Sequence, residues 1–202
     1  MNTTLTEAIR TKNLDLVKKA HAGGCAFRVW TMEDAIRIGT FEIMEWLYEN
    51  GCQWSKGCFR YAIIRIQRKK DAYINKCFDN LITCNPIANI KKHIDARVYR
   101  DVYSVEFKIL DWLLKNKCPF GRAYDTAVGY SDIVLMNWLF KHSCPLDIGV
   151  FSTALKYNVS QEAIFWLCEK QCPQVKPESN IIPSRRSERI KKRPNYLNDY
   201  VC

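Results

Sequence analysis

The chain has 202 residues, of which 48% are hydrophobic and 26% are charged, and its formal net charge is +10. This composition is typical of a globular protein and excludes collagen-like and weakly hydrophobic disordered chains. No apolar run approaches the roughly 18 residues that a membrane helix needs, and the first residues lack the apolar core of a signal peptide. We therefore expect an intracellular protein of the cytoplasm, the nucleus or both, with no membrane contact.

Four Trp-Leu pairs mark an internal repeat, because a cysteine follows each tryptophan by six residues. These segments read EWLYENGC at 45–52, DWLLKNKC at 111–118, NWLFKHSC at 137–144 and FWLCEKQC at 165–172. Two further units lack the tryptophan but have their own marker cysteines, Cys25 and Cys84. A repeat of this length is typical of folds built from stacked units. We predict six units, near residues 4–25, 30–52, 56–84, 90–118, 121–144 and 148–172.

Each unit is predicted to contain two helices. The first surrounds an alanine, and the second carries an aromatic residue 11 or 12 positions later, or 16 positions later in the third and fourth units. The first unit fits the same frame with Lys19 in place of the aromatic residue. In the second unit, Ile43, Trp46 and Leu47 share one helix face. Gly24 and Gly51 directly precede a marker cysteine, so they predict left-handed helix caps. Whether the two 16-residue spacers extend a helix or form a loop stays open.

Stacked pairs bury a continuous core, because a single pair cannot cover its own apolar face. We predict that this core contains the first-helix alanines, the second-helix aromatic residues and the marker cysteines. The alanines are Ala8, Ala35, Ala62, Ala96, Ala127 and Ala154, and the aromatic residues are Trp46, Phe78, Trp112, Trp138 and Trp166. The cysteines are Cys25, Cys52, Cys84, Cys118, Cys144 and Cys172. The predicted fold class is therefore all-α, a solenoid of about six helix pairs over residues 1–173.

The ten cysteines are interpreted as buried thiols. Intracellular thiols stay reduced, and the chain has no CxxC pair of the kind that zinc sites use. It also has no phosphate loop, dinucleotide fingerprint, HExxH or GxSxG motif. His142 lies close to Cys144 in sequence, but that cysteine occupies the shared repeat position. We therefore expect no catalytic residue, no enzymatic activity, no metal and no cofactor.

The basic excess lies in the two long units and in the C-terminal segment, since residues 63–101 carry nine positive and four negative charges and residues 174–202 carry seven and three. Basic side chains beside tyrosines suit an acidic protein surface or nucleic acid, and a solvated helix face is the alternative. The candidate partner-binding patch consists of Arg65, Arg68, Lys69, Lys70, Lys91, Lys92, Arg97 and Arg100.

Residues 174–202 lose the repeat pattern and hold three prolines, so we predict a disordered basic tail. Its basic run is typical of a nuclear import signal or a nucleic-acid contact, and a solubilising tail is the third interpretation. The basic residues of this run are Arg185, Arg186, Arg189, Lys191, Lys192 and Arg193.

The unit resembles an ankyrin repeat, in which an Ala-bearing helix and a second helix ending in Leu-Leu-x-x-Gly-Ala precede a hairpin loop. EIMEWLYENGC matches the second helix, with Gly51-Cys52 in place of Gly-Ala. The Thr-Pro-Leu-His box is absent and most units are shorter than the usual 33 or so residues, so we expect shortened hairpin loops. The Trp-Leu…Cys-Pro ending is similar to short ankyrin-like repeats of large DNA viruses. The last 18 residues resemble the segment after the integrase core in copia-type retroelement polyproteins.

The resemblance implies a binding scaffold without enzymatic activity. We expect a monomer that holds a protein partner of unknown identity, acidic in character, on the polar surface formed by the first helices and the loops. If the viral likeness holds, the partner is a host protein. The alternative is a nuclear nucleic-acid or chromatin binder that uses the C-terminal tail, and a decayed duplicate without a specific partner is a third interpretation.

Overall fold

The computed structural model describes residues 4–81 and 97–170, and every regular element within these two stretches is a helix. The prediction of an all-α protein is therefore confirmed. No helix among the described residues is long and apolar enough to cross a bilayer.

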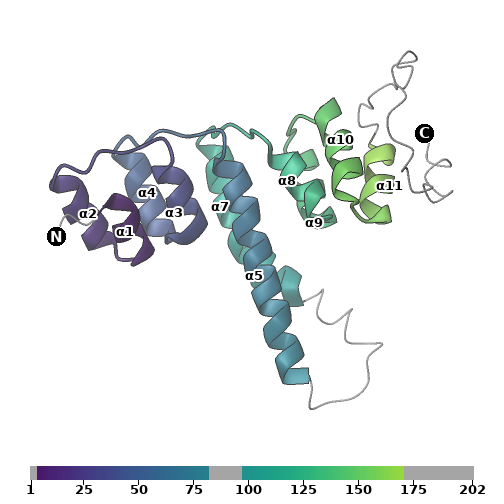
Figure 1. Ribbon diagram of the computed structural model, residues 1–202, viewed down its shortest axis with the longest axis horizontal. Coiled ribbons are helices and arrows are strands. Elements are labelled where there is room, and N and C mark those ends of the chain that lie inside the picture. The colour runs from purple at the N-terminus through teal and green to yellow at the C-terminus, as the bar shows by residue number, and fades with distance from the viewer. Residues whose placement is uncertain (1–3, 82–96, 171–202) are drawn as a thin grey trace, which may run out of the picture.

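The described helices form five pairs in chain order (Figure 1). The first helices of the pairs are α1 (Leu5–Arg10), α3 (Thr31–Ile38), α5 (Cys58–Leu81), α8 (Ala123–Gly129) and α10 (Ile148–Tyr157). The second helices are α2 (Leu14–Ala22), α4 (Phe41–Glu49), α7 (Ser104–Lys115), α9 (Ile133–Lys141) and α11 (Gln161–Glu169). A π-helical segment, η2 (Tyr99–Tyr103), leads directly into α7.

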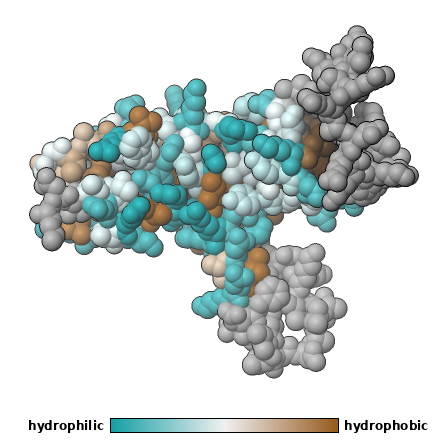
Figure 2. Space-filling view, viewed as in Figure 1, coloured by the Kyte–Doolittle hydropathy of each residue, from teal (hydrophilic) through white to brown (hydrophobic). Residues whose placement is uncertain are grey.

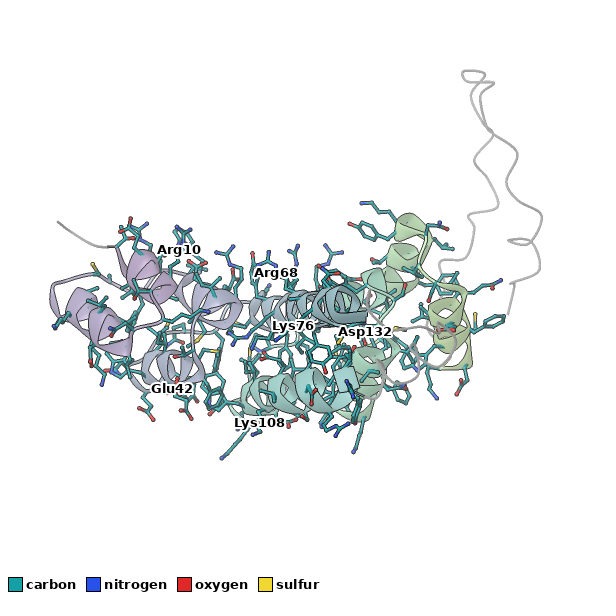
Figure 3. The ribbon with its side chains drawn as sticks, turned by 90° about the horizontal axis from the view of Figure 1, so that it is seen from below. Arg10, Glu42, Arg68, Lys76, Lys108 and Asp132 are labelled. Atoms are coloured by element: carbon teal, nitrogen blue, oxygen red, sulfur yellow. The ribbon has the colours of Figure 1, made fainter. Side chains whose placement is uncertain are left out.

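The first helices lie side by side in one layer, and the second helices lie in another. In the first layer α3 contacts α1 and α5, and α8 contacts α5 and α10, while in the second layer α4 contacts α2 and α11 contacts α9. Figure 3 shows the layers edge-on, with Arg10 and Arg68 projecting from the first layer and Glu42 and Lys108 from the second. We call the outer surface of α1, α3, α5, α8 and α10 the first-helix face.

The repeat alanines lie between the two layers, where their small side chains let the helices approach closely. The five that are described, Ala8, Ala35, Ala62, Ala127 and Ala154, are at most 1% exposed. Trp138 and Trp166 are buried as well, whereas Trp46 and Trp112 are half-buried against the core. Phe78 lies on α5, and Ala96, Cys84 and Cys172 lie outside the described residues.

The described parts of the third and fourth predicted units form one elongated helix pair. Gly39 and Thr40 separate α3 from α4, but residues 58–81 contain neither glycine nor proline, so nothing interrupts α5 over its 24 residues. Residues 97–115 are also continuous helix, and α5 packs against both η2 and α7. The long spacers are therefore helical, and this central pair projects from the row of shorter helices in Figure 1.

Each described marker cysteine follows a Schellman turn at the end of a second helix. Gly51 takes a φ of 85°, and the Cys52 N–H donates to the Leu47 carbonyl at 2.9 Å, which closes the turn. The same turn precedes the other described markers, since Gly24, Lys117 and Ser143 take φ values of 93°, 55° and 56° before Cys25, Cys118 and Cys144. The constant spacing from tryptophan to cysteine thus reflects how each helix ends.

Candidate protein-binding surface

Some basic side chains of the patch expected from the sequence form ion pairs that join α5 to α7. The Arg65 side chain is only 14% exposed, and its Nε donates to Glu106 Oε2 at 2.9 Å. Its Nη1 donates to the carbonyls of Ile36 and Gly39 at the end of α3, at 3.0 and 2.8 Å. Glu106, which is nearly fully buried, also pairs with Lys69. Arg65 therefore joins three helices in the interior and is not presented to a partner.

A second buried carboxylate holds Lys70. The Asp132 side chain is 1% exposed, and one of its oxygens accepts the Leu135 N–H at 3.1 Å, which caps α9. The other oxygen accepts hydrogen bonds from Lys70 at 2.9 Å and from Gln67 and Tyr103. Burial raises the pKa of this carboxyl group, but the hydrogen bonds from Tyr103, Lys70 and Gln67 outweigh burial and lower the pKa below its usual value. The carboxylate is thus ionised and balances the lysine.

The other members of the predicted patch have different surroundings. Arg68, Arg97 and Arg100 are exposed on the projecting central pair. The remaining predicted basic residues lie outside the described part of the chain, namely Lys91, Lys92, Arg185, Arg186, Arg189, Lys191, Lys192 and Arg193.

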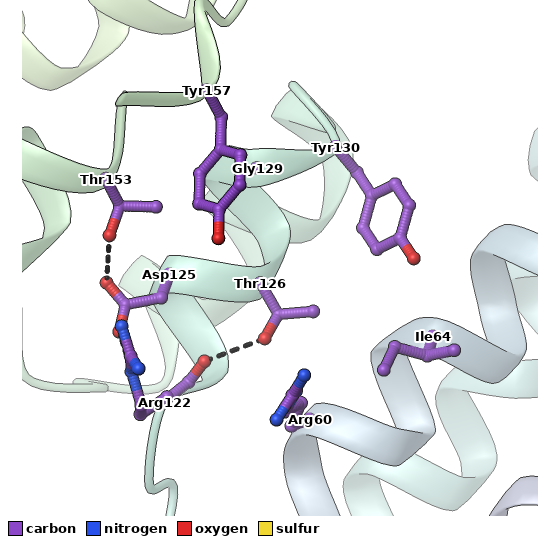
Figure 4. Close-up of a pocket in the computed structure, with 9 residues that line it drawn as sticks. All are labelled: Arg60, Ile64, Arg122, Asp125, Thr126, Gly129, Tyr130, Thr153 and Tyr157. Atoms are coloured by element: carbon purple, nitrogen blue, oxygen red, sulfur yellow. Dashed lines mark hydrogen bonds and ion pairs between the residues drawn. The ribbon is translucent and has the colours of Figure 1, made fainter. Parts of the chain in front are cut away.

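A hollow of about 270 Å³ opens on the first-helix face between α5, α8 and α10 (Figure 4). Arg60 and Ile64 of α5 form one side of it, Thr126 and Gly129 of α8 lie between, and Tyr157 of α10 lies on the side opposite Arg60, while Tyr130, directly after α8, extends toward Ile64. Figure 2 shows hydrophilic side chains gathered over the middle of the molecule, along α5, with separate hydrophobic spots between them. The hollow thus combines polar, cationic and aromatic side chains from three neighbouring helices.

The hollow borders a repeat position that lacks a side chain. Two residues after the repeat alanine, the other first helices carry Arg10, Arg37, Ile64 and Lys156, whereas α8 carries Gly129. A Cβ atom built on Gly129 would meet no other atom within 4 Å. The space beside Gly129 is therefore open.

The hollow has a net positive charge. The Asp125 carboxylate accepts hydrogen bonds from Arg122 Nε at 2.6 Å and from the Thr153 hydroxyl at 3.0 Å. Arg60, by contrast, forms no ion pair within residues 4–81 and 97–170. Two guanidinium groups and one carboxylate leave one positive charge, and Figure 4 shows the Arg60 guanidinium directed toward α8.

Two tyrosines give the hollow an apolar rim. Tyr130 is 48% exposed and Tyr157 is 61% exposed. Tyrosine and arginine are enriched at the energetically important centres of protein interfaces. Both tyrosines and Arg60 were not predicted from the sequence, because they lie outside the segments where basic residues are dense along the chain. Aligning the positions on either side of each repeat alanine would have revealed Gly129.

The described thiols have different environments, and hydrogen bonds with Cys118 and Ser55 lower the pKa of Cys58 to about 7. His142 Nδ1 lies 2.8 Å from the Trp138 carbonyl oxygen, so this ring is engaged with its own helix. Burial raises the pKa of Cys52 to about 11 and that of Cys144 to about 12, which keeps both thiols protonated. The described residues contain no group of three or more His, Cys, Asp or Glu side chains that could hold a metal ion.

No protein-family model, no curated protein and no solved structure matches this chain.

Proposed function

We propose that this protein is a non-enzymatic scaffold that holds a protein partner on its first-helix face. The observation that carries the proposal is the hollow between α5, α8 and α10, which is lined by two exposed tyrosines and by an arginine that has no carboxylate partner among the described residues. A cationic and aromatic hollow on a packed helical layer suits an anchoring side chain of another protein. Because Arg60 supplies the unmatched charge, the partner surface is acidic.

We further propose that the helix pairs form a short ankyrin-like solenoid. The order of the two layers and the Gly51-Cys52 turn support this assignment. The links between successive pairs in the described part of the chain span six to eight residues, which agrees with shortened hairpin loops. A specific interface buries roughly 800 Å² on each partner, an area that three or four neighbouring pairs can provide. The protein acts as a monomer in the cytoplasm or nucleus, and a host protein is the partner if the chain is viral.

A second candidate function is a nuclear contact with nucleic acid or chromatin. The exposed Arg68, Arg97 and Arg100 on the projecting central pair favour it, together with the basic run of residues 185–193. Phosphate contacts of this kind weaken steeply as the salt concentration rises.

Paired charge reversals test the scaffold proposal. Arg60→Glu changes the first-helix face, and Lys108→Glu makes the same change in net charge on the exposed side of the second layer. We expect a protein captured by the full chain to be retained by the Lys108→Glu variant and lost from the Arg60→Glu variant. Capture should also survive nuclease treatment and replacement of the tail arginines and lysines by glutamine.

Two results would contradict the scaffold proposal. If nuclease or the tail replacement abolishes capture, nucleic acid is the partner and the second candidate function applies. If the two charge reversals weaken capture equally, the first-helix face has no special role.

A further inference from the structure

We infer that the hollow between α5, α8 and α10 binds the carboxylate of a glutamate or aspartate side chain within an acidic segment of the partner. The inference rests on the proposed function, because it names the group that the first-helix face would recognise. It goes further in assigning one cavity, one ligand chemistry and one principal donor, Arg60.

The size of the hollow fits a single side chain. Its volume of about 270 Å³ lies below the range of roughly 300 to 1,000 Å³ that is usual for small-molecule and cofactor sites. Ile64 and the rings of Tyr130 and Tyr157 offer apolar surface beside the polar groups. An acidic side chain has the matching form, since a short methylene stem carries a planar charged end.

The charge of the hollow selects a monoanion. Arg60 can donate two parallel hydrogen bonds to one carboxylate, which is the strongest pairing open to a guanidinium group. Asp125 lines the same hollow, and its negative charge is balanced by Arg122. A phosphate group carries close to two negative charges at neutral pH, so Asp125 would oppose it more strongly than a carboxylate.

A tyrosine hydroxyl and a glycine complete the site. The Tyr157 hydroxyl projects into the hollow from the α10 side, opposite Arg60 (Figure 4), and can donate to the second carboxylate oxygen. Gly129 keeps the floor open, since every other first helix places a longer side chain at the equivalent position.

A titration of the full-length protein followed by NMR tests the assignment directly. The probe is N-acetylglutamic acid α-amide, and N-acetylglutamine α-amide is its uncharged counterpart of nearly the same shape. A single charge-assisted pair on an open surface gives an affinity in the millimolar range. We expect saturable shifts of the Thr126, Gly129 and Tyr130 amides with the acid and no saturable shifts with the glutamine compound.

Three variants locate the binding. Arg60→Gln should raise the dissociation constant about tenfold, because the charged donor is lost. Arg68→Gln is the matched control, since it makes the same substitution on an exposed residue two turns further along α5, and it should change nothing. Gly129→Leu should abolish the shifts by filling the hollow, and its Cβ enters open space, so the fold should persist.

Several outcomes would overturn the inference. They are the absence of saturable shifts with the acid, equal shifts with the glutamine compound, and tighter binding of N-acetylphosphotyrosine amide. If the acid fails to bind but Arg60→Glu still releases the protein partner, the scaffold proposal stands and only the carboxylate assignment is wrong. If the acid binds and Arg60→Glu leaves partner capture intact, the site exists but the scaffold proposal fails.

Discussion

Single backbone positions decide how each second helix ends. Gly51 and Lys117 occupy the same turn, at φ values of 85° and 55°, and each precedes a cysteine whose N–H closes the turn. The left-handed caps predicted at Gly24 and Gly51 are confirmed, because glycine adopts this conformation readily. The caps at Lys117 and Ser143 could not be predicted, because residues with a side chain seldom take positive φ.

At this turn, replacing a glycine by alanine and replacing a lysine by glycine should change the free energy of unfolding in opposite directions. Gly51→Ala is expected to lower the free energy of unfolding by about 1 kcal/mol, because an L side chain is strained in the left-handed conformation. Lys117→Gly should raise it by a few tenths to about 1 kcal/mol, since the strain is removed but the unfolded chain gains freedom. Urea denaturation measures both, and a shift of the two variants in the same direction would contradict the assigned turn.

Ion pairs with buried carboxylates connect different helices. The sequence showed Arg65, Lys69 and Lys70 as a cluster, but it could not reveal their partners. Glu106 is 41 residues from Arg65, and Asp132 is 62 residues from Lys70, so only the packing of α5 against α7 and α8 brings them together. The same basic residues that indicated a binding patch therefore serve in part to hold the central pair in place.

Two arginines of α5 should respond very differently to the loss of charge. Arg65→Met leaves Glu106 and the last carbonyls of α3 without their buried donor, so we expect a loss of about 3 to 5 kcal/mol in the free energy of unfolding. Arg68→Met removes an exposed charge on the same helix and should stay within about 0.5 kcal/mol. Chemical denaturation of the two variants compares them, and similar losses would mean that Arg65 is not a structural link.

Asp132 makes stability depend on pH at the acidic end. Its pKa in the folded protein lies below the ordinary value of 3.8, so its stabilising effect is complete above that value and disappears as the pH falls through the folded-state pKa. Asp132→Asn should cost about 3 kcal/mol at neutral pH, because Lys70 loses its buried counter-charge. The difference between wild type and variant should narrow below about pH 4. A constant difference across this pH range would contradict the role assigned to the carboxylate.

The whole molecule is a row of helix pairs whose main contacts run between consecutive pairs. The repeat in the sequence predicted helical pairs and small residues between them, since an alanine recurs in each first helix. It did not predict that the third and fourth units merge. Phe78 and Cys84 have the same six-residue spacing as the aromatic residue and cysteine that mark the end of a second helix in the other units. The first-helix hollow could not be predicted from a motif, since it borders Gly129, a position that lacks a side chain.

In a row of helix pairs, a substitution that destabilises one end should leave the pairs at the other end folded. Trp166→Ala removes a buried ring whose Nε1 donates to Asn137 Oδ1 at 2.8 Å, a loss of about 3 to 5 kcal/mol for the last pairs. We expect faster amide hydrogen exchange in α9, α10 and α11 and unchanged exchange in α1 to α4. Uniformly faster exchange along the chain would show instead that the pairs unfold as one unit.

Amide hydrogen exchange of the full-length protein, measured with and without its captured partner, tests whether the partner occupies the first-helix face. We expect slowed exchange on the first half of α5, on α8 and on α10, around Arg60, Gly129 and Tyr157. Protection confined to α4, α7 and α9, or to residues 174–202, would contradict it.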